Sequence, residues 1–277
     1  MTGRDNTIDP QAMRAFGATV DFGRTADDYT SNRAGFPKAF FDLMHERRYA
    51  HPGQHALDLG CGAGSVARGL AQMGMTVTGL DPAQPLLDQA ARLDNDAGVR
   101  VSYLQGTAET PPFDDDSFDL ITAGQCWHWF DRPTVAAQVA RLLKPGGRLV
   151  IAHFDWLPLP GTVVAATEAL ILTHNPDWAG AGGSGIYPDW LADMAIAGFT
   201  GLETASFDMA QPYSHAAWRG RIRASAGIAA SLGTDAVAQF DMSLQEMLAT
   251  DFPEDPLHIP HRVWLATGIN TNHAAPE

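Results

Sequence analysis

Two carboxylates and a run of glycines stand close together near residue 60. Gly60, Gly62 and Gly64 follow an apolar stretch directly, Asp58 lies two positions before the first of them, and Asp81 ends a second apolar stretch. Glycine lets the backbone turn sharply and approach a ligand that a side chain would keep away. In dinucleotide-binding folds, an acid at the tip of the second strand meets a ribose hydroxyl. The spacing therefore predicts a small-molecule site around this glycine turn.

A second group of residues with chemical potential is Trp127-His128-Trp129. Imidazole accepts a proton near neutral pH, and indole rings bind cations and aromatic groups. His128 is therefore a candidate general base, and the tryptophans are candidate ligand-binding residues. The alternative is that Trp127 and Trp129 pack in the core or in a lid and that His128 is a hydrogen-bonded structural residue.

The elements that position these groups follow from apolar periodicity. Val66, Leu70 and Met73 form a stripe suited to packing a helix on a sheet. Short apolar stretches alternate with such stripes, and we expect strands near residues 56–59, 77–81, 99–105, 120–122 and 148–152. The helix before the last of these should end at Lys144-Pro145-Gly146-Gly147. Because ligands bind beyond the carboxyl ends of parallel strands, both groups should face one sheet edge.

Three motifs carry a resemblance to a known family. The segment Asp58-Leu59-Gly60-Cys61-Gly62-Ala63-Gly64 resembles the first motif of class I S-adenosylmethionine-dependent methyltransferases. Gly106-Thr107-Ala108-Glu109, followed by the P-F-x-D-x-S-F-D pattern of residues 112–119, is similar to the adenine-side signature of that family. Leu143-Lys144-Pro145-Gly146-Gly147 matches it as well. Residues 127–131 and 214–221 resemble the small-molecule methyltransferases of the trans-aconitate type.

The resemblance implies S-adenosylmethionine as the cofactor and transfer of its methyl group to a small-molecule acceptor, without a metal. It implies a cofactor site formed by Arg33, Asp58, Gly60, Cys61, Gly62, Asp81, Ala108, Glu109 and Gln125. It also implies that Tyr29 lies over the cofactor, so His128 and Tyr29 are the candidate catalytic residues. If His128 is not the base, Tyr29 or His153 takes that place. Whether oxygen, nitrogen or carbon receives the methyl group stays open.

The implied fold is α/β, with a Rossmann-like, seven-stranded, mostly parallel sheet, helices on both faces, an antiparallel last strand and helical cap elements. We expect one domain over residues 1–277: N-terminal lid helices in 1–50, the cofactor-binding core in 51–155, and a substrate cap with C-terminal strands in 156–277. Within the last part, we expect a helix near 188–197, strands near 202–209 and 262–266, and helices over 214–250.

The amino-acid composition limits which kinds of partner we expect this protein to bind. The formal net charge of −14 opposes binding to nucleic acid, which normally requires a basic stripe. Only two cysteines occur, so we expect reduced thiols, and no signal peptide or membrane span is evident. We therefore expect a cytoplasmic monomer or homodimer that binds neither nucleic acid nor membrane. The clustered Arg219, Arg221 and Arg223 should form surface ion pairs, because residues two apart do not share a helix face.

Three alternatives belong to other classes. A nicotinamide-dependent oxidoreductase would use a similar turn, but its third glycine position is occupied here by Ser65. A nucleic-acid methyltransferase is disfavoured because the segment after the fourth strand lacks an Asn-Pro-Pro-Tyr type motif. A non-catalytic binding protein could also have this fold. Titration with S-adenosylmethionine and with NAD separates these alternatives.

Overall fold

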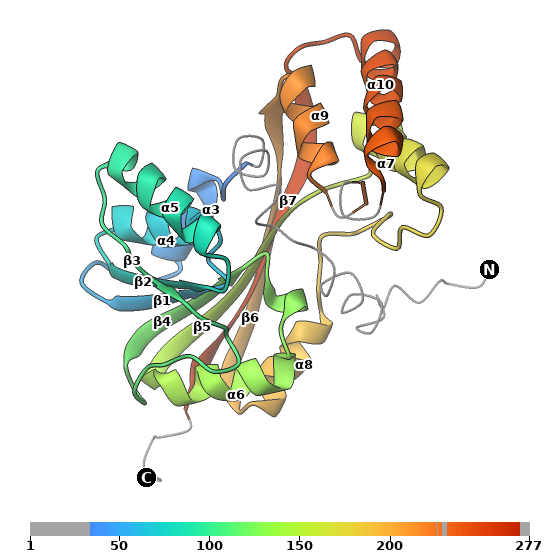
Figure 1. The fold of residues 1–277 in the computed structure, drawn as a ribbon. Coiled ribbons are helices and arrows are strands. Elements are labelled where there is room, and N and C mark those ends of the chain that lie inside the picture. The colour runs from blue at the N-terminus through green and yellow to red at the C-terminus, as the bar shows by residue number, and fades with distance from the viewer. Residues whose placement is uncertain (1–33, 226, 229–231, 272–277) are drawn as a thin grey trace, which may run out of the picture. The chain divides into compact units, whose positions relative to one another are not determined.

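The structure is a computed structural model that describes residues 34–225, 227–228 and 232–271. Its central feature is a seven-stranded sheet with strand order β3-β2-β1-β4-β5-β7-β6 (Figure 1). The strands are β1 (His55–Leu59), β2 (Thr76–Asp81), β3 (Ser102–Gln105), β4 (Phe118–Gly124), β5 (Leu143–Trp156), β6 (Phe199–Tyr213) and β7 (Leu257–Asn270). The first five run parallel, and β7 pairs antiparallel with β5. The expected α/β fold with an antiparallel last strand is thus confirmed.

Helices connect the strands and add a second layer. They are α3 (Lys38–Glu46), α4 (Ser65–Gln72), α5 (Gln84–Ala97), the 3₁₀ helix η2 (Trp127–Trp129), α6 (Arg132–Leu142), α7 (Val163–His174), α8 (Asp189–Ile196), α9 (His215–Arg223) and α10 (Thr234–Asp251). Among the described residues, none of these helices is both long and apolar enough to cross a membrane.

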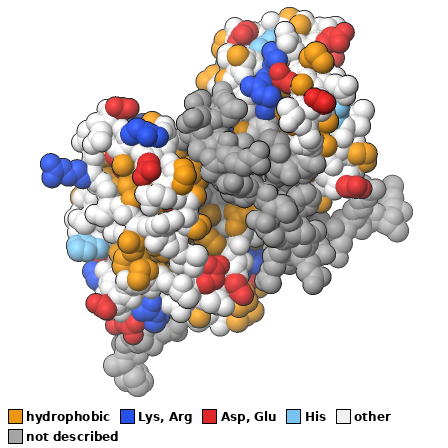
Figure 2. Space-filling view, in the orientation of Figure 1, with side chains coloured by type: hydrophobic (Ala, Val, Ile, Leu, Met, Phe, Trp, Pro, Cys, Tyr) orange, Lys and Arg blue, Asp and Glu red, His pale blue; other side chains and the backbone are white. Residues whose placement is uncertain are grey.

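Contacts divide the described chain into two compact units. We call residues 34–156, 185–211 and 261–271 the sheet unit, and residues 157–184 and 212–260, apart from the undescribed positions, the helical unit. The helical unit therefore begins almost where the expected substrate cap begins, at residue 156, but the chain returns to the sheet unit twice after that point. On the face shown in Figure 2, charged side chains of both signs lie on the described residues of each unit.

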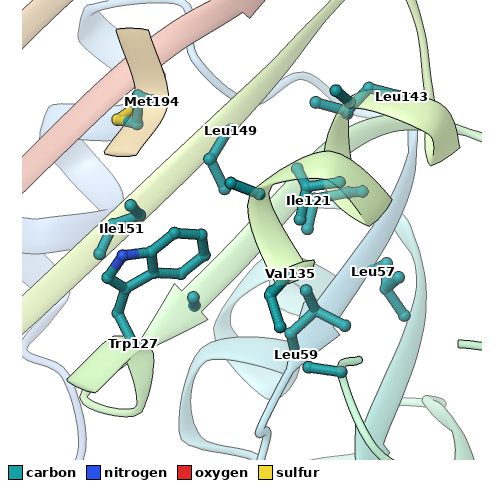
Figure 3. Packing of buried hydrophobic residues seen from close by; sticks show 14 of the residues in the cluster. Leu57, Leu59, Ile121, Trp127, Val135, Leu143, Leu149, Ile151 and Met194 are labelled. Atoms are coloured by element: carbon teal, nitrogen blue, oxygen red, sulfur yellow. The ribbon is translucent and has the colours of Figure 1, made fainter. Parts of the chain in front are cut away.

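Alternation along the strands sends side chains to opposite faces of the sheet. Leu57, Leu59, Ile121, Leu149 and Ile151 pack on one face against buried residues of α6 and α8 (Figure 3). The intervening residues pack on the other face against α3 and α4. Both faces are consequently covered, which explains why the central strands are almost continuously apolar.

Two expected boundaries are displaced. β5 begins at Leu143, directly after α6, but Lys144-Pro145-Gly146-Gly147 interrupts its pairing with β4, because Phe118 is level with Leu143 and Leu120 with Arg148. The third strand begins at Ser102 rather than at residue 99, because the N–H of Val99 donates to the carbonyl of Asp94 (3.0 Å) and closes the end of α5. Glycine at position 98, with φ of +69°, makes that helix end possible.

In the helical unit, α10 packs with α7 and with α9. Two of these helices begin at a residue whose side-chain oxygen accepts a backbone N–H, Thr162 for α7 and Ser214 for α9. Arg219 and Arg223, four residues apart and so on one face of α9, both pair with Asp241 of α10. The expectation of ion pairing is confirmed for these two arginines.

Candidate active site

The strand register aligns the ends of five strands. Leu59 of β1 is level with Leu80 of β2 and Ala123 of β4, and Ala123 is level with Ile151 of β5. Asp81, the last residue of β2, is level with the end of β3. The residues that follow these positions therefore lie along a single edge, as expected for parallel strands.

The three glycines of the turn have different surroundings. All three have a positive φ: +58° at Gly60, +52° at Gly62 and +76° at Gly64. A residue with a Cβ atom would be strained in this backbone conformation. A Cβ atom at Gly60 would meet the Cβ of Cys126 at 2.9 Å, and one at Gly64 would overlap the Tyr103 hydroxyl. A Cβ atom at Gly62 would meet no atom of the described residues within 4 Å. Gly60 and Gly64 are thus needed for packing, whereas Gly62 faces space that the described part of the chain leaves open.

Asp81 closes this turn from the neighbouring strand. One carboxylate oxygen accepts the N–H of Gly62 and the other accepts the N–H of Ala83, each at 2.9 Å. Burial raises the pKa of Asp81, and these two hydrogen bonds oppose the rise. Each carboxylate oxygen has a further lone pair, so Asp81 is able to accept hydrogen bonds from both hydroxyls of a diol beside Gly62.

Asp58 belongs to β1, just before the same turn, and lies within the protein. Its side chain is 1% exposed and accepts the hydroxyl of Thr122 (2.6 Å) and the N–H of Ala67 (3.1 Å). Burial raises the pKa of Asp58 to about 7, although both hydrogen bonds favour the charged form. These contacts tie β1 to β4 and to the first turn of α4. The structure therefore shows Asp58 holding the turn in place.

Other residues expected at the cofactor site vary in exposure. Cys61 and Ala108 are buried, at 8% and 5% exposed. Burial, reinforced by the nearby Asp58 and Asp81, raises the pKa of the Cys61 thiol well above its ordinary value. Glu109 is half-buried and accepts the N–H of Asp131 at 3.1 Å. The two cysteines are free thiols, as expected.

Gln125 directly follows β4 and has a positive φ of +58°, which is uncommon for a residue with a side chain. Its backbone N–H donates to the carbonyl of Ala152, and its side chain donates to the carbonyl of Phe154. Both bonds join the end of β4 to β5. Such strained positions are concentrated at functional sites.

The aromatic segment after β4 divides between core and edge. Trp127 is fully buried among Leu149, Ile151 and their neighbours (Figure 3), and its ring N–H donates to Asp193 of α8 at 3.0 Å. It is a packing residue. His128 and Trp129 are half-buried, with ring centroids 4.7 Å apart. Of the other catalytic and cofactor predictions, Tyr29 and Arg33 lie outside the described residues.

The structure adds residues of β5 and the segment before α8 to this edge. His153 is 3% exposed, and its ring centroid lies 5.3 Å from that of His128. Its Nδ1 atom is 3.1 Å from a carboxylate oxygen of Asp155, which also accepts the hydroxyl of Tyr187 at 2.6 Å. The His-x-Asp spacing at the end of a strand was a usable signal, because residues two apart share a face. Nothing in the local sequence indicates that Tyr187 joins them.

Comparisons with known proteins agree with this geometry. Residues 57–151 match the family model described as a methyltransferase domain. This part of the chain is therefore similar to a methyltransferase domain. The matched residues run from β1 into β5 and include both the glycine turn and the segment with His128.

Methyltransferases of other organisms are similar to part of this chain. An uncharacterized methyltransferase of Mycobacterium bovis is 35% identical over 131 residues, which cover 47% of this chain and 51% of that protein. Nocamycin O-methyltransferase of Saccharothrix syringae is 36% identical over 174 residues, covering 55% and 61%. The chain thus spans about half the length of the first of these relatives. The structure of the YcgJ protein of Bacillus subtilis has a TM-score of 0.54 and 23% identity over 84% of this chain and 98% of that one, a likeness of fold.

Proposed function

We propose that this protein transfers the methyl group of S-adenosylmethionine to a small-molecule acceptor. The observation that carries the proposal is the pairing of Gly62, which faces space that the described residues leave open, with the Asp81 carboxylate, which is bonded to its N–H. A nucleoside cofactor needs a close backbone approach and acceptors for its ribose hydroxyls, and this pair supplies both. The similarity of residues 57–151 to a methyltransferase domain supports the same conclusion.

The residues of the sheet edge have separate tasks in this proposal. Asp81 and Gly62 hold the ribose, while Glu109 and Gln125 border the same site from the ends of other elements. When bound, the cofactor supplies a methyl group made electrophilic by a positively charged sulfur. The protein aligns the acceptor with that methyl group and excludes water. The name of the Saccharothrix relative, an O-methyltransferase, supports a hydroxyl-bearing natural product or metabolite as the acceptor.

The site differs from a nicotinamide site at Ser65. Its hydroxyl oxygen accepts the N–H of Phe36 at 2.8 Å, so this position anchors the segment before α3. In the nicotinamide fingerprint a glycine here permits close packing of helix and strand. NAD is therefore the appropriate control ligand.

Isothermal titration calorimetry tests the proposal. We expect S-adenosylmethionine to bind and NAD to give no heat. Replacing Asp81 with alanine should weaken cofactor binding by about 1.5–3 kcal/mol, the value of a hydrogen bond to a charged group. Asp88→Ala, which removes an exposed carboxylate on α5, is the matched control and should bind normally. A folded wild-type protein that binds no S-adenosylmethionine, or that binds NAD more tightly, contradicts the proposal.

Incubating the protein with S-adenosylmethionine and metabolite extracts identifies the acceptor. The expected product is a metabolite heavier by one methylene unit, formed together with S-adenosylhomocysteine. Sedimentation of the same preparation measures whether the protein is a monomer or a homodimer, the two states that we propose.

A further inference from the structure

A buried imidazole at the carboxyl end of β5 is held in one orientation by its neighbours. His153 and Asp155 are two residues apart on the strand and therefore share a face. The Nδ1 atom of His153 is 3.1 Å from an oxygen of Asp155. The hydroxyl of Tyr187 donates to that same oxygen at 2.6 Å, so the carboxylate is anchored from a segment 32 residues away.

Aromatic rings surround the imidazole on its other sides. Tyr187 and Trp190 stack with centroids 4.2 Å apart and planes 5° apart. The ring of His153 lies 4.4 Å from the Tyr187 centroid and 4.8 Å from the Trp190 centroid. His128 of η2 approaches from the end of β4, with its centroid at 5.3 Å. Among the described residues, the titratable groups that face His153 from the packed elements are thus Asp155, Tyr187 and His128.

The proton positions on His153 follow from its partner. Burial alone would raise the pKa of Asp155, but the positive charge of a protonated His153, its hydrogen bond and that of the Tyr187 hydroxyl hold the pKa well below its ordinary value. An ionised Asp155 only accepts hydrogen bonds, so Nδ1 of His153, 3.1 Å away, carries the hydrogen. Whenever the His153 ring is neutral, its lone pair is therefore on Nε2.

Nε2 of His153 is buried and has no hydrogen-bond partner among the described residues. A buried polar atom without a partner costs free energy, and such atoms in native structures call for an explanation. A hydroxyl group of a bound acceptor would supply the missing hydrogen bond to this lone pair. His153 lies next to Ala152, which is bonded to Gln125 at the strand edge that carries the glycine turn.

We propose that His153 is the general base that removes the proton of a hydroxyl-bearing acceptor, with Asp155 and Tyr187 as its positioning residues. This inference rests on the proposed methyl transfer. The acceptor oxygen bonds to the methyl carbon as the carbon–sulfur bond breaks, and the electron pair of that bond stays on sulfur. The hydroxyl proton moves to Nε2 of His153, and the resulting imidazolium is neutralised by Asp155. Charge is conserved, since one cation is lost at sulfur and one is gained at His153.

The arrangement points to a hydroxyl because an alcohol or phenol is largely protonated at neutral pH and needs a base during attack. A carboxylic acid is already ionised at that pH and needs none. His128, the base expected from the sequence, lies beside the acceptor site in this scheme and does not take the proton.

Nitrogen-15 NMR of the protein without any ligand tests the protonation pattern. We expect the neutral His153 ring to carry its hydrogen on Nδ1 and to show a bare Nε2, with the resonances assigned by their loss in His153→Gln. Asp155→Asn should mix the two tautomers, because an amide can donate or accept. Asp119→Asn is the matched control, since that carboxylate is similarly exposed, at 25% against 27%, and lies at the other end of the sheet. A wild-type His153 with its hydrogen on Nε2, or no change in Asp155→Asn, would overturn the inference.

Kinetics with the acceptor found by the metabolite screen test the role itself. His153→Gln should lower turnover by roughly 10²–10⁴-fold while its calorimetric affinity for S-adenosylmethionine stays normal. Asp155→Asn should move the acidic limb of the pH profile to lower pH, because the imidazolium loses its counter-charge. His128→Gln should lose less activity and keep that limb. A His153→Gln enzyme within tenfold of wild type refutes the base, whereas a protein that binds no S-adenosylmethionine refutes the proposed function instead.

Discussion

Replacing Asp58 with asparagine should change how the stability of the sheet unit depends on pH. The Asp58 carboxyl is 1% exposed, and its burial raises the pKa from 3.8 to about 7. The difference is about three pKa units, and each unit corresponds to about 1.36 kcal/mol. Ionised Asp58 therefore costs the folded state about 4 kcal/mol relative to the neutral acid.

The direction of this pH dependence follows from the proton that Asp58 binds in the folded state. Between pH 3.8 and about 7 the folded protein holds a proton on Asp58 that the unfolded chain has released. The stabilising effect of this proton is complete below the unfolded pKa and declines as pH rises, until it is lost above about pH 7. Asparagine does not titrate, so the stability of the variant lacks this pH-dependent contribution.

Urea denaturation of both proteins, followed by circular dichroism from pH 4 to pH 8, measures the effect. We expect the wild type to lose about 4 kcal/mol of stability relative to Asp58→Asn across this range. Asp119→Asn provides a control that should show only a small dependence, of opposite sign, over this range. The bonds of Asp119 to Lys144 and to the N–H of His55 outweigh its burial and lower its pKa, so its contribution is lost mainly as pH falls below the ordinary value of 3.8. A difference between wild type and Asp58→Asn that does not change with pH would show that Asp58 titrates normally, and would refute the reasoning.

Three further variants separate binding from stability. Gly62→Val should abolish calorimetric binding of S-adenosylmethionine without unfolding the protein, because the branched side chain would fill the open space. Gly98 directly follows α5, has a similar φ and is equally open among the described residues, so Gly98→Val should cost comparable stability but bind normally. Thr122→Val should destabilise the protein by about 1–3 kcal/mol, since the Thr122 hydroxyl donates a hydrogen bond to Asp58. The cost should be larger at pH 8, where Asp58 is ionised, than at pH 5, and equal costs at the two pH values would contradict this. Asp241→Asn should lower the free energy of unfolding of the helical unit by about 1 kcal/mol, because it removes both partly exposed ion pairs to α9. The difference from wild type should fade in acid, where Asp241 is protonated, and a difference that persists there would exclude an electrostatic cause.

The sequence by itself determined the sheet and the turn that faces the site. Strand and helix periodicity is a local property, and so is the need for glycine where φ is positive, as at Gly60, Gly62 and Gly64. The acid at the tip of the second strand is also predictable, because chain order and parallel pairing place Asp81 beside the turn. These features depend on neighbours within about twenty residues.

Only the tertiary structure decided which of the chemically capable side chains face the interior and which meet one another. Asp58 and Asp81 are both carboxylates beside the turn, yet Asp58 is bonded to β4 and α4, whereas Asp81 is bonded to the turn itself through the N–H of Gly62. Trp127 is core because α8 supplies Asp193 as its partner. Tyr187 reaches Asp155 across 32 residues of sequence. Such contacts depend on how distant segments of the chain pack together. The periodicity of the sequence indicates only whether a face is apolar, so it carries no information about these contacts.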